Sequence, residues 1–148
     1  MARPQVPDSN VFIRLSHDPD SDPKFFRLLG SGRIWLCSVV AAEVYFGTRS
    51  QEDREAIGQI ARTLKTTNRL LTPTHDEWVI AATLVARYSR TRGEVALPHH
   101  LHDALIAVST ARLQGEVVTA NTKHFETWAA LARDNGLDVI VRPYEPHA

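Results

Sequence analysis

Apolar residues follow two patterns along the chain, short continuous runs and longer segments with helical spacing. The short runs predict buried strands. They cover residues 33–38, 69–73, 116–120 and 138–142. Segments with apolar residues three or four positions apart predict helices. These segments cover residues 50–66, 74–92 and 122–135, with further helices after Ser38 and after Pro98. Strands that alternate with helices indicate a three-layer α/β/α sandwich with a central parallel sheet.

The first third of the chain has weaker signals. Pro7 gives no ladder donor, so the first strand is expected to be short or an edge strand. Residues 17–23 combine turn formers with acids and predict a loop or the start of a helix. Residues 25–29 predict a short helix that ends at Gly30 and Gly32. Ser38 is expected to cap the helix that runs to Gly47.

Composition narrows the class of protein. With 148 residues, a single domain over residues 1–148 is expected. The 17 basic and 17 acidic side chains balance, which argues against a histone-like nucleic-acid binder but not against a nuclease. Cys37 is the sole cysteine, so no intrachain disulfide forms, and its strand suggests a core residue. Residues 1–10 contain no apolar stretch of signal or membrane type, which predicts a cytoplasmic protein with no membrane partner.

Polar residues with metal-binding or hydrogen-bonding side chains fall at or near strand ends. In parallel sheets the ligand site lies outside the carboxyl ends of the strands. The residues placed there are Asp8, Ser38, Glu43, Asp103, Thr119 and Asn121. Like charges about 4 Å apart repel by about 4 kcal/mol at an effective dielectric near 20, so converging carboxylates favour a cation. Sequence spacing does not show whether these acids converge.

Each acid also has a simpler interpretation. Asp8 alone is equally well explained as a turn or cap residue. Asp103 also suits a helix amino terminus electrostatically, although a functional role is the better interpretation. Glu43 is harder to explain in this way, because it lies in a mostly apolar helix and an unpaired buried acid is costly.

Three sequence blocks together resemble the PIN domain family, of the VapC toxin type. Asp8-Ser9-Asn10-Val11-Phe12 resembles the Asp-(Ser/Thr)-Asn signature that opens PIN domains. Residues 38–47, with Ser38 and Glu43, resemble the segment after the second strand. Residues 102–125 resemble the third block, an Asp-Ala-Leu-Ile-Ala helix followed by a strand that ends in Thr-x-Asn-Thr-x-x-Phe.

The resemblance implies a metal site. Asp8, Glu43 and Asp103 would be both the catalytic residues and the ligands of Mg²⁺ or Mn²⁺. Asn10 would buttress the first acid, and Ser38 and Thr119 would add hydroxyl groups. Many relatives carry a fourth acid in the last block, where this chain has Asn121, and His124 also stands where another acid is common. This departure predicts weaker metal binding than in a four-acid relative.

The resemblance also implies an activity and partners. The expected reaction is hydrolysis of RNA phosphodiester bonds by an endoribonuclease, the toxin of a type II toxin–antitoxin pair. The partners would be RNA, a small antitoxin protein and a second copy of the chain as a homodimer. Arg14, Arg49 and Lys123 lie just beyond the three blocks and are candidate RNA contacts. Single-stranded RNA is favoured, because its bases are free to be splayed and stacked.

Other functions remain open. The same fold without strong catalysis would be an RNA-binding or interaction module, and a DNA-directed nuclease is a third possibility. A phosphoacceptor domain ranks last, because only Asp8 stands at the first strand end. His99, His100 and His102 suggest zinc, but a solvated helix start is the better interpretation because neither a cysteine partner nor an HExxH pattern accompanies them. The three tryptophans are expected in the core or at an interface rather than as base-stacking platforms. They are Trp35, Trp78 and Trp128.

Overall fold

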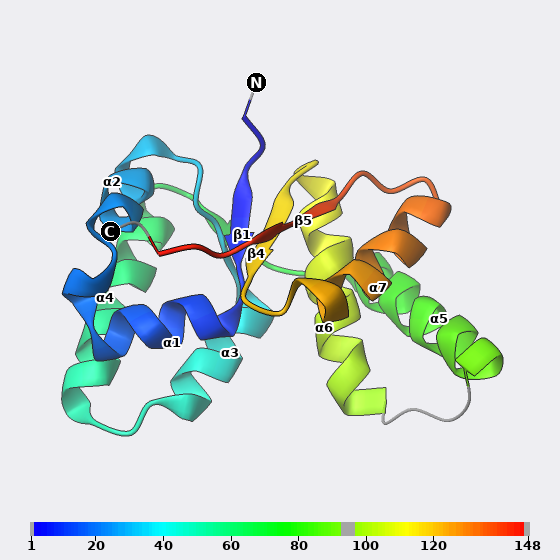
Figure 1. Ribbon diagram of the computed structural model, residues 1–148, viewed down its shortest axis with the longest axis horizontal. Coiled ribbons are helices and arrows are strands. Elements are labelled where there is room, and N and C mark those ends of the chain that lie inside the picture. The colour runs from blue at the N-terminus through cyan, green and yellow to red at the C-terminus, as the bar shows by residue number, and fades with distance from the viewer. Residues whose placement is uncertain (1, 93–96, 147–148) are drawn as a thin grey trace.

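The computed structural model describes residues 2–92 and 97–146, and the side chains of residues 97–99 are outside that description. Every pair of hydrogen-bonded strands in the described residues is parallel. The strands are β1 (Gln5–Pro7), β2 (Leu36–Cys37), β3 (Leu70–Leu71), β4 (Glu116–Thr119) and β5 (Ile140–Pro143). β1 and β4 lie side by side in the middle of the molecule (Figure 1).

The strands form two hydrogen-bonded groups that are linked through Gln5. One group has the order β1-β4-β5 and the other pairs β2 with β3. A parallel bridge joins Gln5 to Ile34, just before β2. The Gln5 amide donates to the Arg33 carbonyl at 2.7 Å, and the Trp35 amide donates to the Gln5 carbonyl at 2.9 Å. The carboxyl ends of these strands therefore point to the same edge.

Helices cover the strands on both sides, which confirms the three-layer α/β/α architecture. α1–α4 lie on one side of β1 and β4 in Figure 1, and α5–α7 lie on the other. A single 3-10 turn, η1 (Pro19–Ser21), separates the first two helices. The helices are α1 (Ser9–His17), α2 (Pro23–Ser31), α3 (Ser38–Gly47), α4 (Gln51–Thr66), α5 (His75–Arg92), α6 (Leu97–Arg112) and α7 (Thr122–Asp134).

The core explains why α6 lies against the sheet. Residues 104–108 of this helix are all buried, and they belong to the same apolar cluster as Val6 of β1 and Val117 of β4. Gly115 lets β4 start close to β1, because a Cβ there would lie 2.9 Å from the Pro4 carbonyl oxygen. The Glu116 amide donates to that carbonyl at 2.8 Å. These contacts place Thr119 beside the end of β1.

Several local expectations need correction. The helix α1 was not predicted, although Val11, Phe12 and Leu15 show its buried face. Ser38 does not cap α3: Cys37 is the cap residue, and the Ser38 hydroxyl lies 3.2 Å from the Thr72 hydroxyl. The strand predicted over residues 33–38 is shorter, because regular pairing covers only Leu36–Cys37.

Other expectations are confirmed. β1 is short, as expected from Pro7: it has 3 residues and ends at that proline. Residues 17–23 contain the turn η1 and the start of α2, whose amino terminus is capped by the Asp22 carboxylate through the Phe25 amide. Cys37 is fully buried. In the described residues no helix is both long and apolar enough to cross a membrane.

Candidate metal centre

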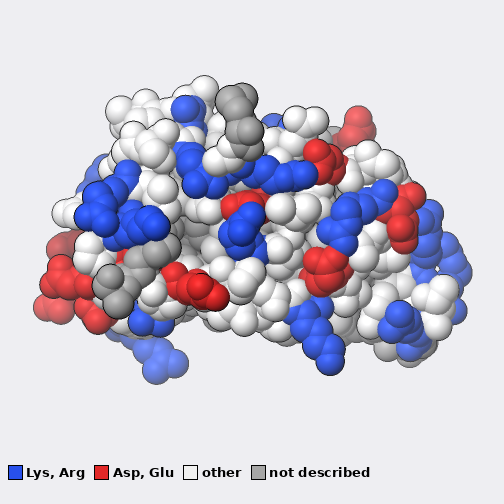
Figure 2. Space-filling view, turned by 45° about the horizontal axis from the view of Figure 1, so that its top comes forward, with Lys and Arg blue, Asp and Glu red and all other residues white. Residues whose placement is uncertain are grey.

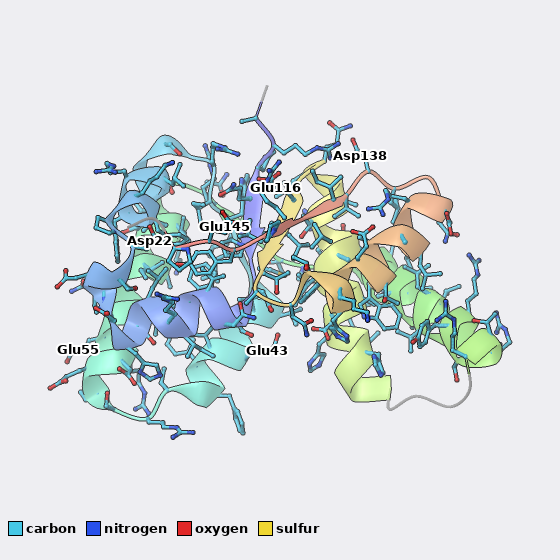
Figure 3. All side chains as sticks on the ribbon, viewed as in Figure 1. Asp22, Glu43, Glu55, Glu116, Asp138 and Glu145 are labelled. Atoms are coloured by element: carbon cyan, nitrogen blue, oxygen red, sulfur yellow. The ribbon has the colours of Figure 1, made fainter. Side chains whose placement is uncertain are left out.

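Three elements bring Asp8, Glu43 and Asp103 to the carboxyl ends of the strands. Asp8 directly follows β1 and is the N-cap residue of α1. Glu43 lies in α3, which begins directly after β2, and Asp103 lies in the first half of α6. Glu43 is labelled in Figure 3, below the ends of β1 and β4. The negative charges of Asp8 and Asp103 both act on Glu43, and that of Asp103 acts on Asp8.

Asp8 is held firmly although it is buried. One carboxylate oxygen, Oδ1, accepts from the Ser9 amide at 2.7 Å, and the other, Oδ2, accepts from the Thr119 hydroxyl at 3.2 Å. Burial raises the pKa of Asp8 and the charge of Asp103 adds to the rise, while the hydrogen bonds from Ser9 and Thr119 oppose it. Asp8 is therefore a fixed carboxylate whose charge is costly in the absence of a cation.

Glu43 lacks the support that Asp8 has. Its Oε1 atom is buried and has no hydrogen-bond partner among the described residues. Burial, followed by the charges of Asp8 and Asp103, raises the pKa of Glu43 to about 7. An unpaired carboxylate of this kind costs free energy unless it is protonated or meets a cation. Glu43 is thus the most unsatisfied acid of the cluster.

Asp103 is paired with a histidine from another helix. The Nε2 atom of His124, in the first turn of α7, lies 2.5 Å from Asp103 Oδ2. The side chains are 33% and 18% exposed, so this contact lies at the rim of the cluster. The sequence singled out His124 as a departure from an acid and as a candidate phosphate contact. It did not predict the pairing with Asp103, because a contact between residues 21 positions apart on two helices has no local signal.

The donor set suits a hard divalent cation. Such ions prefer oxygen ligands, and Mg²⁺ typically keeps several waters beside one or two carboxylates. Within the described residues, no three Asp, Glu, His or Cys side chains already form an arrangement that holds a metal directly. The unpartnered Oε1 of Glu43 and the mutual repulsion of the three acids nevertheless fit a cation whose remaining ligands are water.

The residues expected to support the acids differ in the contacts that they make. Thr119 contacts Asp8 directly, and its Oγ1 atom also accepts from the Asn121 amide at 3.0 Å. Asn10 is exposed, and the contacts to Asp8 come from its neighbour Ser9. Asn121 is exposed and is the N-cap residue of α7, without a side-chain cap hydrogen bond. Ser38 contacts Thr72 on the strand β3 side.

The candidate RNA contacts and the other histidines differ in exposure. Arg14, Arg49 and Lys123 are exposed. His102 is exposed, while the His100 ring packs 5.4 Å from that of Trp128. The His99 side chain falls outside the described residues.

The tryptophans differ in burial. Trp128 is in the core at 1% exposure, Trp35 packs against the core beneath Arg69, and Trp78 is 43% exposed.

One cleft among the described residues lies away from the acids. It has a volume of about 660 Å³, and none of Asp8, Glu43 and Asp103 lines it. Its walls come from β1, β4, β5 and α2, and they include the buried Glu116. Lys and Arg side chains gather on this side of the molecule, with acidic side chains among them (Figure 2).

Comparisons with known proteins agree with the fold. The chain resembles a chain of VapBC2 from Rickettsia felis, solved bound to a DNA fragment from its promoter, with 16% identity and a TM-score of 0.60. That match covers 95% of this chain and 98% of the other. It also resembles a chain of FitAB bound to IR36 DNA, with 19% identity, a TM-score of 0.61, and coverage of 97% and 99%. These two similarities concern the fold.

Two sequence comparisons differ in outcome. The search of curated proteins gives no match to the chain. The family model of the PIN domain matches residues 6–140, which include all three acids. The chain therefore belongs to the PIN domain family.

Proposed function

We propose that this protein is a divalent-metal-dependent endoribonuclease that hydrolyses RNA at a site made of Asp8, Glu43 and Asp103. The observation that carries the proposal is the half-buried Glu43, whose Oε1 atom has no partner among the described residues. Burial and two neighbouring carboxylates raise its pKa to about 7. A carboxylate in this state is stabilised by a cation, which is the requirement of a metal-dependent nuclease.

The side chains of the cluster would divide the work. Asp8, Glu43 and Asp103 would hold the cation, Mg²⁺ or Mn²⁺. When bound, the cation supplies an activated water and neutralises charge on the phosphate. Ser9 and Thr119 hold Asp8 in place through both of its carboxylate oxygens.

Exposed cations would bind the RNA. Arg14, Arg49 and Lys123 are exposed on α1, after α3 and on α7, and they would contact phosphates of single-stranded RNA. Their guanidinium and ammonium groups offset the negative charge that the acids present to the substrate.

The proposed biological role is that of a type II toxin, held inactive in the cytoplasm by a small antitoxin protein. The VapC resemblance and the similarity to chains from VapBC2 and FitAB structures support this role. Exposed aromatic side chains support protein partners, including a second copy of the chain, because Phe46 is 94% exposed and Tyr45 is 41% exposed. A small reading frame beside the gene would agree with an antitoxin.

The test is cleavage of single-stranded RNA with Mg²⁺ or Mn²⁺ and with EDTA. We expect metal-dependent cleavage that falls at least about a hundredfold in Asp103→Asn, the scale lost when one transition-state contact is removed. Asp20→Asn, at an exposed acid of η1, is the control and should cleave normally. Thermal unfolding of both variants separates a loss of activity from a loss of folding.

Two results would contradict the proposal. Absence of cleavage with both metals would favour an RNA-binding or interaction module, a candidate supported by Asn121 and His124 in place of acids. Faster digestion of single-stranded DNA than of RNA in parallel reactions would favour a DNA-directed nuclease.

A further inference from the structure

The contact between His124 and Asp103 joins α7 to the acid cluster. His124 Nε2 lies 2.5 Å from Asp103 Oδ2, a short separation for a nitrogen and an oxygen. A carboxylate accepts hydrogen bonds and does not donate them, so the imidazole Nε2–H is the donor. Within the described part of the chain, this is the hydrogen bond that the Asp103 side chain makes.

The His124 ring is restrained by its neighbours. The Phe125 ring stands nearly perpendicular to it, with centroids 5.9 Å apart and an interplanar angle of 83°. The His100 ring lies 6.0 Å away and itself packs against the buried Trp128. Because these rings limit the movement of the imidazole, the hydrogen bond also limits the movement of the Asp103 carboxylate.

The other two acids show what this restraint adds. Asp8 is held through both oxygens by groups next to it in the fold, whereas Glu43 has an unpartnered oxygen. Asp103 is intermediate, because His124 holds Oδ2 and leaves Oδ1 without a hydrogen bond in the described residues. A carboxylate that is held by one oxygen can present the other to a cation in a fixed direction.

We propose that His124 is a positioning residue of the metal site, which orients the Asp103 carboxylate toward the cation without ligating it. The proposal rests on the metal dependence proposed above and adds a residue to it.

The experiment is a titration with Mn²⁺, followed by the electron paramagnetic resonance signal of the free ion, so no activity is needed. His124→Leu fills much of the volume but has no donor, whereas His124→Gln offers an amide N–H close to the position of Nε2. We expect His124→Leu to weaken Mn²⁺ binding by about 10- to 100-fold, the scale for loss of a partner that orients a ligand. His124→Gln should bind within about threefold of the wild-type protein, because the donor is retained.

A matched control is available on another pair of helices. His17 Nδ1 lies 2.9 Å from Asp53 Oδ2, so His17→Leu removes a histidine–carboxylate contact away from the acids. Its Mn²⁺ affinity should equal that of the wild-type protein. Circular dichroism of each variant checks that the fold is intact, and the Gln variant keeps the test decisive if the Leu variant unfolds.

Three outcomes overturn the inference. Unchanged affinity in His124→Leu removes any role, and equal weakening in both His124 variants assigns the effect to packing. Hyperfine coupling between Mn²⁺ and an imidazole nitrogen that is lost in His124→Gln would make His124 a ligand instead. If wild-type protein binds no Mn²⁺, the proposed function itself fails; if it binds Mn²⁺ and cleaves RNA while His124→Leu is unchanged, only this inference fails.

Discussion

Two glutamates that are both withdrawn from water show how this molecule treats buried charge. Glu116, on β4, is 2% exposed, and its carboxylate accepts from Gln5 Nε2 at 2.8 Å and from Arg142 Nε at 2.9 Å, with Arg33 Nη2 3.7 Å away. Glu43, on α3, has a buried Oε1 atom without a partner among the described residues and faces two further acids. Figure 3 labels both residues, which belong to different elements and different surroundings.

The difference lies in the partners rather than in the burial. A buried charge with cationic and amide donors contributes to the structure, and its removal leaves those donors unpaired. A withdrawn charge with anionic neighbours opposes folding until something compensates it. The comparison therefore assigns Glu116 to the architecture and Glu43 to the binding of a ligand.

The largest effect is expected at Glu116. Glu116→Ala should lower the free energy of unfolding by about 3 kcal/mol, because it leaves a cavity and removes the acceptor of the Gln5 and Arg142 side chains. Urea unfolding measures this change. Glu55→Ala, at an exposed acid of α4, should change stability by less than about 0.5 kcal/mol. A loss below about 1 kcal/mol at Glu116 would show that its partners rehydrate freely, and the contrast with Glu43 would fail.

The opposite sign is expected at Glu43 in metal-free protein. The pKa of Glu43 is raised in the fold from its ordinary 4.5 to about 7, so the native state holds a proton that the unfolded state has released. Stability contributed by this group is therefore lost as the pH rises from 4.5 through 7. Glu43→Gln should stabilise metal-free protein by about 2 kcal/mol at pH values above this window, with allowance for partial exposure.

Urea unfolding across this pH range compares the two proteins. Subtracting the Glu43→Gln profile from that of the wild type isolates Glu43, because the burial that raises the pKa of Asp8 remains in both proteins. Saturating Mn²⁺ should reverse the order, so that the wild type becomes the more stable protein. Parallel profiles without metal would contradict the raised pKa and with it the basis of the metal site.

A smaller effect is expected from Thr119→Val, which keeps the shape of the side chain and removes its hydroxyl. The change takes a donor from Asp8 Oδ2 and an acceptor from the Asn121 amide, so stability should fall by about 1 kcal/mol and Mn²⁺ should bind several times more weakly. Thr110→Val is the control, because the buried Thr110 hydroxyl donates to the Ile106 carbonyl within α6. Thr110→Val should lower stability but leave the Mn²⁺ affinity unchanged. Equal Mn²⁺ affinity in both variants would show that Asp8 needs no support from Thr119.

Much of the fold could be predicted from local pattern. The runs at 116–120 and 138–142 became β4 and β5 with small shifts at their ends, and the segment at 122–135 became α7. The missed helix α1 has Val11, Phe12 and Leu15 at helical spacing, but it starts within the Asp-Ser-Asn signature and ends in a turn-rich segment. Ser38 was misplaced by one residue because its position at a strand end fits a cap, while the fold pairs its hydroxyl with Thr72.

The sequence by itself determined the class of fold and the order of most of its elements, because hydrophobic period is a local property of the chain. Its short motifs also singled out three acids as the proposed site. Only the tertiary structure decided which acids are satisfied. Asp8 and Thr119 are 111 residues apart, and Asp103 and His124 are 21 apart, so these contacts exist only after the strands and helices have packed. The unpartnered oxygen of Glu43 is likewise a property of its surroundings, since burial and neighbouring charge, not the residue type, make it require a cation.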